Sequence, residues 1–313
     1  MKKLLVMNKL RITSKLLGIL LLTGLFACSD GDSEVDSKGN ARVSATDAAV
    51  DAQNVNSVNL SVSEVRATAN GESRTVASFN TPKQFNLMAY QNGETYFLGE
   101  GELEAGSYSD LRFILSGESD SYVEMKDGSR KDLIIENATT TGYQISGAFD
   151  VAANSTTNLV ADIDLRKAIV TEAQSSSETA FKLRSNGRVV VEDATGEIKG
   201  TVEGEANSGE QLVVYAYNKG TFSASEESEP AEGRTRYEGS VNSAIVAEDG
   251  SYTLAFMEEG DYEVYVASYS NTDNDEDLEF QGRVTTDIMI NGSLFNTISV
   301  ESNSTITANI LLK

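Results

Sequence analysis

The sequence predicts an all-β protein with two tandem β-sandwich domains, preceded by a secretory signal and a short flexible segment. Apolar residues alternate with polar ones in many short runs, the pattern of strands that bury one face. Pairs of turn residues separate these runs at intervals typical of sandwiches. The pairs are Asn70-Gly71, Asn92-Gly93, Asp127-Gly128, Asn186-Gly187, Asp249-Gly250 and Asn291-Gly292.

The N-terminus has the features of a secretory signal. Met1–Lys15 contains five basic residues and no acidic residue, and Leu16–Phe26 is apolar apart from one threonine and two glycines. This apolar run is about half of the roughly 20 residues that a membrane-spanning helix needs. The small residue Ala27 precedes Cys28, which is the only cysteine of the chain. We therefore expect residues 1–27 to be removed as a signal peptide.

The stretch Leu25-Phe26-Ala27-Cys28 resembles the cleavage motif of bacterial lipoproteins, in which the cysteine becomes the lipidated N-terminus. The resemblance implies two or three acyl chains, such as palmitate, at Cys28. One acyl chain binds a membrane only marginally, whereas two or three hold a protein essentially permanently. An ordinary cleaved signal with a chance cysteine is the alternative.

Residues 28–39 are expected to form a flexible tether. Ser29–Asp36 is acidic and small and contains no aromatic residue, so it cannot bury enough apolar area to offset its ordering entropy. It resembles the acidic segment that directs lipoproteins of the Bacteroidetes group to the cell surface. We therefore expect an outer-membrane protein, lipid-anchored and facing the cell exterior. A plain spacer is the alternative reading of this segment.

Composition restricts the function of the remaining 286 residues, which suffice for two domains. Beyond the five basic residues of the signal, the chain contains 20 Lys and Arg against 48 Asp and Glu. Such a charge repels nucleic acid, so no nucleic-acid partner is expected. The chain contains no histidine, which rules out Ser-His-Asp and Cys-His catalysis. Paired carboxylates could still hydrolyse glycosides.

The first domain is expected at residues 40–193. Val58, Leu60 and Val62 share one phase and Val65 and Ala67 the other, which predicts a bulge near Ser63-Glu64. Leu165–Gln174 is the only segment that looks helical. Four stretches resemble a family of uncharacterised bacterial surface domains, domain of unknown function 4382 (DUF4382), which implies a β-sandwich and no agreed activity. They are Ala41–Ala49, Val58–Thr68, Ala105–Phe113 and Leu159–Asp164.

The second domain is expected at residues 196–313. In one strand Tyr262, Val264 and Val266 face one way while Tyr265, Ala267 and Tyr269 face the other, and Ile306–Leu312 is a terminal strand. Three stretches resemble the carboxypeptidase regulatory-like, or prealbumin-like, β-sandwich. The resemblance implies inward-pointing Tyr252 and Tyr262, and a role as spacer, stalk or adhesive accessory. The stretches are Gly196–Val202, Asp249–Leu254 and Glu259–Val264.

Ser223–Gly233 lacks an apolar period and is expected to be a mobile loop. The densest acidic cluster is Asn271–Glu279, where Asp273, Asp275 and Asp277 could ligate one Ca²⁺ through oxygen. The helix–loop–helix calcium pattern fails there, because Leu278 stands at its glycine position. A solvated hairpin tip is the alternative. No other cofactor is expected.

Asp162 and Asp164 lie two residues apart and therefore on one face of a strand. They could form a carboxylate pair for acid–base catalysis or cation binding. We favour a structural role, in which they cap the helix that follows.

The sequence thus favours a non-catalytic cell-surface lipoprotein that binds or adheres to a glycan, a protein or a surface complex. A structural spacer or shaft that presents another component is the alternative, and a carboxylate-based hydrolase is the least favoured. An exposed tyrosine-lined groove would favour glycan binding, and an open edge strand would favour strand addition.

Overall fold

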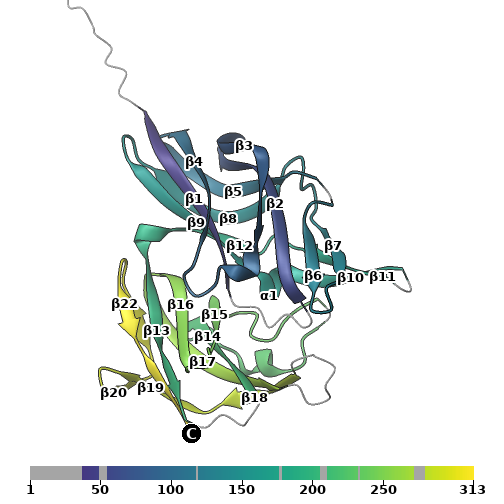
Figure 1. Cartoon of the computed structure of the whole chain (residues 1–313). Helices are drawn as coiled ribbons and strands as arrows, with labels where there is room; N and C mark the ends of the chain where they lie inside the picture. Colours follow the sequence, from purple (N-terminus) through teal and green to yellow (C-terminus); the bar gives the residue numbers. More distant parts are fainter. Residues whose placement is uncertain are drawn as a thin grey trace, which may run out of the picture. The chain divides into compact units, whose positions relative to one another are not determined.

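The computed structural model describes residues 37–48, 55–117, 119–175, 178–204, 210–231, 233–270 and 279–313. All of them belong to one compact unit, Asp36–Lys313. The expected signal peptide, Cys28 and nearly all of the tether lie outside these ranges. Among the described residues, no helix is long and apolar enough to cross a membrane. The fold is all-β, as predicted, with two successive β-sandwiches (Figure 1).

The first sandwich consists of β1–β12, coloured purple to teal in Figure 1. Its strands join into one 12-stranded sheet in the order β10-β11-β7-β6-β2-β5-β8-β12-β9-β1-β4, with β3 paired to β2. The strands are β1 Lys38–Ala48, β2 Val55–Ala69, β3 Glu72–Asn86, β4 Tyr96–Glu104, β5 Gly106–Leu115, β6 Tyr122–Met125, β7 Arg130–Ile134, β8 Tyr143–Val151, β9 Thr156–Asp164, β10 Ile169–Ser175, β11 Glu178–Leu183 and β12 Gly187–Val191.

The predicted bulge in β2 is confirmed. The register of β2 against both β3 and β5 shifts between Val62 and Glu64. Val58, Leu60 and Val62 before the shift and Val65 and Ala67 after it are all buried. The extra residue moves the apolar set from even to odd positions, so both halves of this long strand face the same core.

Close backbone packing brings β3 onto β4 and helps to enclose this core. A Cβ atom added at Gly101 of β4 would lie 1.9 Å from the carbonyl oxygen of Val76 in β3. At Gly99 an added Cβ would lie 2.7 Å from the Cβ of Ala77. Only glycine allows the two strands to approach so closely.

The predicted helix Leu165–Gln174 is wrong beyond its first turn. Helix α1 spans Leu165–Ala168, and strand β10 begins at Ile169 and pairs antiparallel with β11. The reason lies in the run Ile169-Val170-Thr171, because β-branched side chains favour strands over helices. Pairing with β11 stabilises the extended form.

The second sandwich consists of β13–β23, coloured green to yellow in Figure 1, and follows the three-residue 3-10 helix η2, Glu192–Ala194. One sheet has the order β16-β13-β23-β19-β20 with β22 on β13, and the other β15-β14-β17-β18 with β21 on β17. The strands are β13 Thr195–Glu203, β14 Glu210–Asn218, β15 Asn242–Ile245, β16 Ser251–Glu258, β17 Gly260–Ser270, β18 Glu279–Val284, β19 Thr286–Ile290, β20 Ser293–Phe295, β21 Ile298–Val300, β22 Thr305–Thr307 and β23 Asn309–Leu312.

The two phases predicted for β17 are confirmed. Tyr262, Val264 and Val266 pack in the core between the sheets, where Tyr252 is also buried. The expected terminal strand is divided into β22 and β23, both of which run parallel to β13. The predicted turn before Tyr252 places Gly250 at φ +82°, a conformation that favours glycine.

The opposite face of β17 packs in a second, aromatic cluster. It contains Tyr215, Tyr217, Tyr237 and Tyr269, with Phe222 and Tyr265 against them. Tyr237 comes from the segment 219–241 and stacks on Tyr215 of β14 with ring centroids 4.2 Å apart. The outer face of this sheet is therefore covered by a loop segment rather than exposed to solvent.

The described part of Ser223–Gly233 is accordingly a structured element and not the mobile loop that the sequence predicts. It contains the 3-10 helix η3, Ala224–Glu227. The carboxylate of Glu226 accepts hydrogen bonds from the Tyr217 hydroxyl at 2.8 Å and from the Gly239 N–H at 2.6 Å. The periodicity of apolar residues could not predict that this segment is ordered. Polar contacts and the packing of Tyr237, which follows it in the chain, hold the segment in place.

Tyr237 offers a test of this packing. Its ring is fully buried, but its hydroxyl has no hydrogen-bond partner among the described residues. Tyr237→Ala should lower the free energy of unfolding by about 3–5 kcal/mol, the range for removal of a buried aromatic ring. Tyr237→Phe should leave it unchanged or slightly raised, because an unpaired buried hydroxyl is costly. Urea unfolding measures both, and an equal loss in the two variants would contradict the packing described.

Candidate functional site

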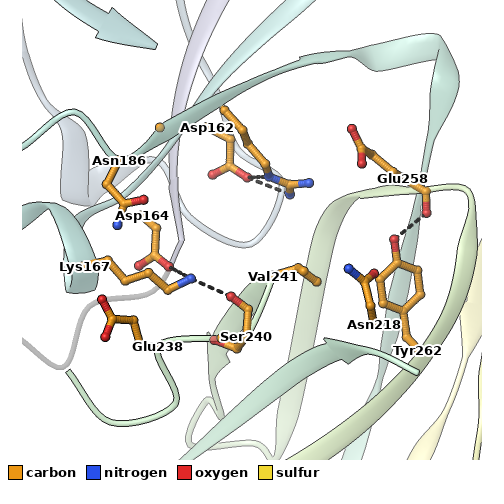
Figure 2. Close-up of a pocket in the computed structure, with 13 residues that line it drawn as sticks. Asp162, Asp164, Lys167, Asn186, Asn218, Glu238, Ser240, Val241, Glu258 and Tyr262 are labelled. Atoms are coloured by element: carbon orange, nitrogen blue, oxygen red, sulfur yellow. Dashed lines mark hydrogen bonds and ion pairs between the residues drawn. The ribbon is translucent and has the colours of Figure 1, made fainter. Parts of the chain in front are cut away.

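A cavity of about 310 Å³ lies where the first sandwich meets the second. Figure 2 shows its polar lining, which comes from both sandwiches. The end of β9, α1 and the start of β12 form one side, and β14, β16, β17 and the segment after η3 form the other. The lining residues are Asp162, Asp164, Lys167, Asn186, Gly187, Arg188, Asn218, Glu238, Gly239, Ser240, Val241, Glu258 and Tyr262.

Asp162 and Asp164 both line the cavity, as their spacing in β9 predicted. Strand β9 lies between β1 and β12 in the sheet, so both of its edges are paired. Asp162 is 5% exposed and the Asp164 side chain 13% exposed. Charged groups buried to this extent require partners.

Arg188 of β12 is the partner of Asp162. Its Nε atom donates to Oδ2 of Asp162 at 2.8 Å, and its Nη2 atom donates to the carbonyl oxygen of Phe256 in the second sandwich at 2.9 Å. Burial raises the pKa of Asp162, and the charge and hydrogen bonds of Arg188 offset only part of that effect. One guanidinium thus binds both sandwiches.

Asp164 has two cationic partners, Arg166 and Lys167, each 3.1 Å from its Oδ2 atom. Burial raises the pKa of Asp164, but the two positive charges outweigh burial and hold it below its ordinary value. Burial also lowers the pKa of the Lys167 ammonium, and Asp164 opposes that change.

Asp164 is the N-cap residue of α1, but its side chain makes no capping hydrogen bond of ordinary geometry. The Lys167 N–H still lies close enough to the carboxylate to lower its pKa. The Leu165 N–H instead donates to Oδ1 of Asp47, at the end of β1, at 3.1 Å. Gln91 donates to the other carboxylate oxygen of Asp47 at 3.0 Å. Burial raises the pKa of Asp47 well above its ordinary value. The alternation of buried Ala41, Val43 and Ala45 could have placed Asp47 on the inner face.

Arg166 of α1 reaches into the second sandwich. It is the central residue of the junction, by which we mean the polar contacts around the cavity that join the two sandwiches. Its Nη1 atom donates to the carbonyl oxygens of Arg236 at 2.8 Å and Tyr237 at 3.2 Å, and its Nη2 atom to Oγ of Ser240 at 2.8 Å. Its guanidinium lies 5.2 Å from the centroid of the Tyr215 ring, a cation–π distance. Lys167 beside it donates to the Ser240 carbonyl oxygen.

Sequence reasoning missed these cations. Arg166 and Lys167 follow Asp164 directly, so their proximity to it could have been foreseen from the strand-to-helix turn. The carbonyl groups that they bind could not, because Arg236 to Ser240 lie about 70 residues later in the chain. No local pattern connects the two segments.

The charged side chains of the junction link the first sandwich to the second. Each carboxylate of β9 is bound to a cation, and those cations also bind carbonyl groups of the second sandwich. A general base must bring its free oxygen to within about 3 Å of a substrate proton. Here the Oδ2 atoms of Asp162 and Asp164 bind the cations of the junction, whereas Oδ1 of Asp164 is buried without a hydrogen-bond partner among the described residues. Among the described residues, no cluster of three Asp, Glu, Cys or His could hold a metal ion.

Two predicted sites lie outside the described residues. Cys28, the expected lipidation site, precedes them, and Asp273, Asp275 and Asp277 fall in the gap between 270 and 279. Lipidation and calcium binding therefore stay predictions.

Comparison with family models gives one match. Residues 38–184 match the family described as "Domain of unknown function (DUF4382)". This DUF4382 domain spans β1–β11 and therefore contains Asp47, Asp162, Asp164 and Arg166. It starts two residues before the expected domain start, at the first residue of β1, and is followed by further β structure. Most of the cations and acids that form the junction thus belong to the family domain.

None of the curated proteins compared with the chain matches it. Among solved structures, the Bacillus anthracis TIE protein has 12% identity over 88% of this chain and 34% of its own, with a TM-score of 0.19. This chain thus spans about a third of that protein. The major pilin subunit BcpA of Bacillus cereus has 9% identity, over 88% of this chain and 70% of its own, at TM-score 0.21. The minor pilin of Streptococcus agalactiae has 12% identity, over 87% of this chain and 95% of its own, with a TM-score of 0.21. Such scores do not establish a common fold.

Replacement of Arg166 tests the junction. Arg166→Ala should lower the free energy of unfolding by about 3–5 kcal/mol, because it leaves buried partners of the guanidinium unpaired. It should also separate the unfolding of the two sandwiches into two transitions in calorimetry.

The matched control for this variant is Arg74→Ala. Its ion pair with Glu72 is shorter than that of Arg166 with Asp164, 2.6 Å against 3.1 Å, but both side chains are more than half exposed. Removal of an exposed pair should cost less than about 1 kcal/mol. Equal effects of the two substitutions would show that Arg166 does not hold the junction.

The raised pKa of Asp47 predicts that the stability of the protein depends on pH. A carboxyl group whose pKa is raised by folding destabilises the protein progressively as pH rises above its ordinary value, 3.8. Asp47→Asn keeps an oxygen that can cap α1 and removes the buried charge. The variant should therefore be more stable than wild type at pH 7, by about 1 kcal/mol or more, and this advantage should shrink toward pH 4. A stability difference that does not change with pH would contradict the burial of a charge there.

Proposed function

We propose that the protein is a non-catalytic, lipid-anchored protein of the outer cell surface that acts by binding or adhesion. Residues 1–27 would be the signal peptide, Cys28 the lipidated residue and residues 28–39 the tether. The domains at 40–193 and 196–313 would stand on that tether, the second being a carboxypeptidase regulatory-like sandwich. A net negative charge suits a protein that is exposed to solvent at the cell surface. The same charge repels nucleic acid, so no nucleic-acid partner is proposed.

The junction network is the observation that carries the proposal. Its three cations each bind both sandwiches, and the carboxylates of β9 that could catalyse a reaction neutralise those cations. Interfaces between domains usually permit relative motion unless they are large or strongly bound. Arg166 is buried and Arg188 is 28% exposed, and these cationic contacts together favour a fixed arrangement, which suits a protein that presents one face to a partner.

A spacer or shaft is the second candidate, and the same network favours it, because a shaft also needs a fixed arrangement of its domains. Binding of a ligand distinguishes an adhesion or binding protein from a spacer. The test uses the full chain, purified in detergent, on an array of neutral and acidic glycans and matrix proteins. Saturable binding to any of them supports the proposal, and the absence of binding across the array supports the spacer.

A hydrolase is the third candidate, and one observation speaks for it. The pKa values of Asp162 and Asp164 move in opposite directions, as those of an acid and a base do in many active sites. We assign the difference to burial and to the unequal number of cations around them. Cleavage of an array glycan by wild type but not by Asp162→Asn would overturn the non-catalytic assignment.

The anchor gives a separate prediction. Cys28→Ser removes the thiol to which acyl chains would attach, so the protein should leave the membrane fraction and appear in the soluble fraction. Immunoblots of the two fractions from expressing cells measure this. Ser29→Ala, which keeps the cysteine, is the matched control and should remain with the membrane. If Cys28→Ser stays bound as firmly as wild type, the lipoprotein assignment is wrong.

A further inference from the structure

The second sandwich has an open side with a groove of about 410 Å³. Strands β18, β19 and β20, labelled in Figure 1, border it, and β17 contributes to its base. Within the described part of the chain, β18 pairs only with β17 and β20 only with β19. The two sheets thus end at this side without a strand to close the gap between them. The volume lies within the range of about 300–1,000 Å³ typical of ligand sites.

Two large apolar side chains are exposed at this groove. Only Phe97, Leu294 and Phe295 are large, apolar and exposed among the described residues, and the last two lie side by side on β20. Phe295 pairs with Ile288 in the β19–β20 register, so both side chains lie on the same face of the sheet. Ile288 is buried in the core, whereas Phe295 is 45% exposed. The ring of Phe295 is therefore a core-side aromatic group that no strand covers.

Two of the three charged side chains that line the groove, Arg283 and Asp287, form ion pairs within the protein. Arg283 forms an ion pair with Glu227 at 2.9 Å, and Asp287 one with Lys313 at 2.6 Å. The Tyr265 hydroxyl donates to the Glu263 carboxylate at 3.1 Å. The other polar side chains of the lining are neutral hydroxyl and amide groups. They belong to Thr285, Thr286 and Asn296.

We propose that this groove binds a neutral glycan, with the apolar face of a pyranose ring on Phe295. The inference rests on the binding function proposed above and specifies its site and ligand. Aromatic rings contribute large apolar area at low entropic cost, and the neutral threonine and asparagine groups can exchange hydrogen bonds with sugar hydroxyls. Arg283, the cation of the lining, is already paired with Glu227 and offers little to an anionic ligand. The net charge of −23 also repels such a ligand.

Strand addition fits the groove less well. The edge at β20 consists of three residues, so it can offer few backbone groups to an added strand. The edge at β18 has six residues, but Glu279 and Arg283 are charged, which disfavours pairing with an added strand. Typical strands are about five or six residues long. A peptide ligand is therefore an outcome that the experiment must be able to reveal.

The experiment measures binding of four neutral hexasaccharides, maltohexaose, cellohexaose, xylohexaose and mannohexaose, to the full chain in detergent. Hexagalacturonate serves as the anionic comparison, and isothermal titration gives the dissociation constants. We expect at least one neutral probe to bind and hexagalacturonate not to bind. Phe295→Ala should weaken binding at least tenfold. Leu294→Ser should weaken it less, because adjacent side chains of a strand point to opposite faces.

The matched control is Phe97→Ala. Phe97 is a similarly exposed phenylalanine, 38% against 45%, but it lies on β4 of the first sandwich, so its removal should leave binding unchanged. Melting curves of all three variants verify that they fold. Failure of all four neutral probes, or equal binding by wild type and Phe295→Ala, overturns the groove assignment. If wild type then binds a protein or acidic glycan on the array, the binding function stands and only the groove assignment falls.

Discussion

The insertion of Arg166 into the second sandwich is the interaction on which the arrangement of the two sandwiches depends. Its side chain is 1% exposed, so its charge requires complete compensation. Asp164 supplies the opposite charge, and carbonyl and hydroxyl groups of the second sandwich supply acceptors. The same carbonyl groups belong to the segment that carries Tyr237 onto the aromatic cluster. The junction and the outer face of the second sandwich are therefore parts of one packed region.

The place of β9 and α1 in the first sandwich explains why they can hold the junction. Strand β9 lies between β1 and β12, and Asp47 at the end of β1 accepts the hydrogen bond that starts α1. The helix lasts one turn before β10 begins, so Arg166 and Lys167 project from a short, fixed corner. Arg188 at the start of β12 adds a third cation from the neighbouring strand. The three-residue connection η2 then leads directly into β13.

Local patterns predicted much of the fold. Alternation placed the buried residues of β2 and β17, and the change of phase at Ser63-Glu64 located a bulge, because register and burial are coupled in a strand. The helix after Asp164 was predicted too long, since β-branched residues and pairing with β11 favoured a strand. The aromatic cluster of the second sandwich was not predicted, because the tyrosine that completes it comes from a segment without apolar periodicity.

The candidate site was predicted only in part. The spacing of Asp162 and Asp164 placed both at one cavity, but their partners depend on contacts between segments about 70 residues apart. The groove on the second sandwich arises because β18 and β20 have no further neighbour within the described ranges, which is a property of topology and not of any sequence motif. Residue types thus indicated which groups need partners, and only the structure identified the partners.

The burial of the junction has a consequence for the conditions in which the protein can work. Salt weakens ion pairs on a protein surface, because mobile ions screen exposed charges over about 8–10 Å at physiological ionic strength, whereas buried pairs are screened much less. Asp164 and Arg166 are largely shielded from solvent, so dissolved ions cannot readily come between them. At the cell surface, the location proposed above, a protein meets changing salinity without the control that the cytoplasm provides. Its two sandwiches should keep their arrangement across such changes, while the exposed pairs on its strands weaken and re-form.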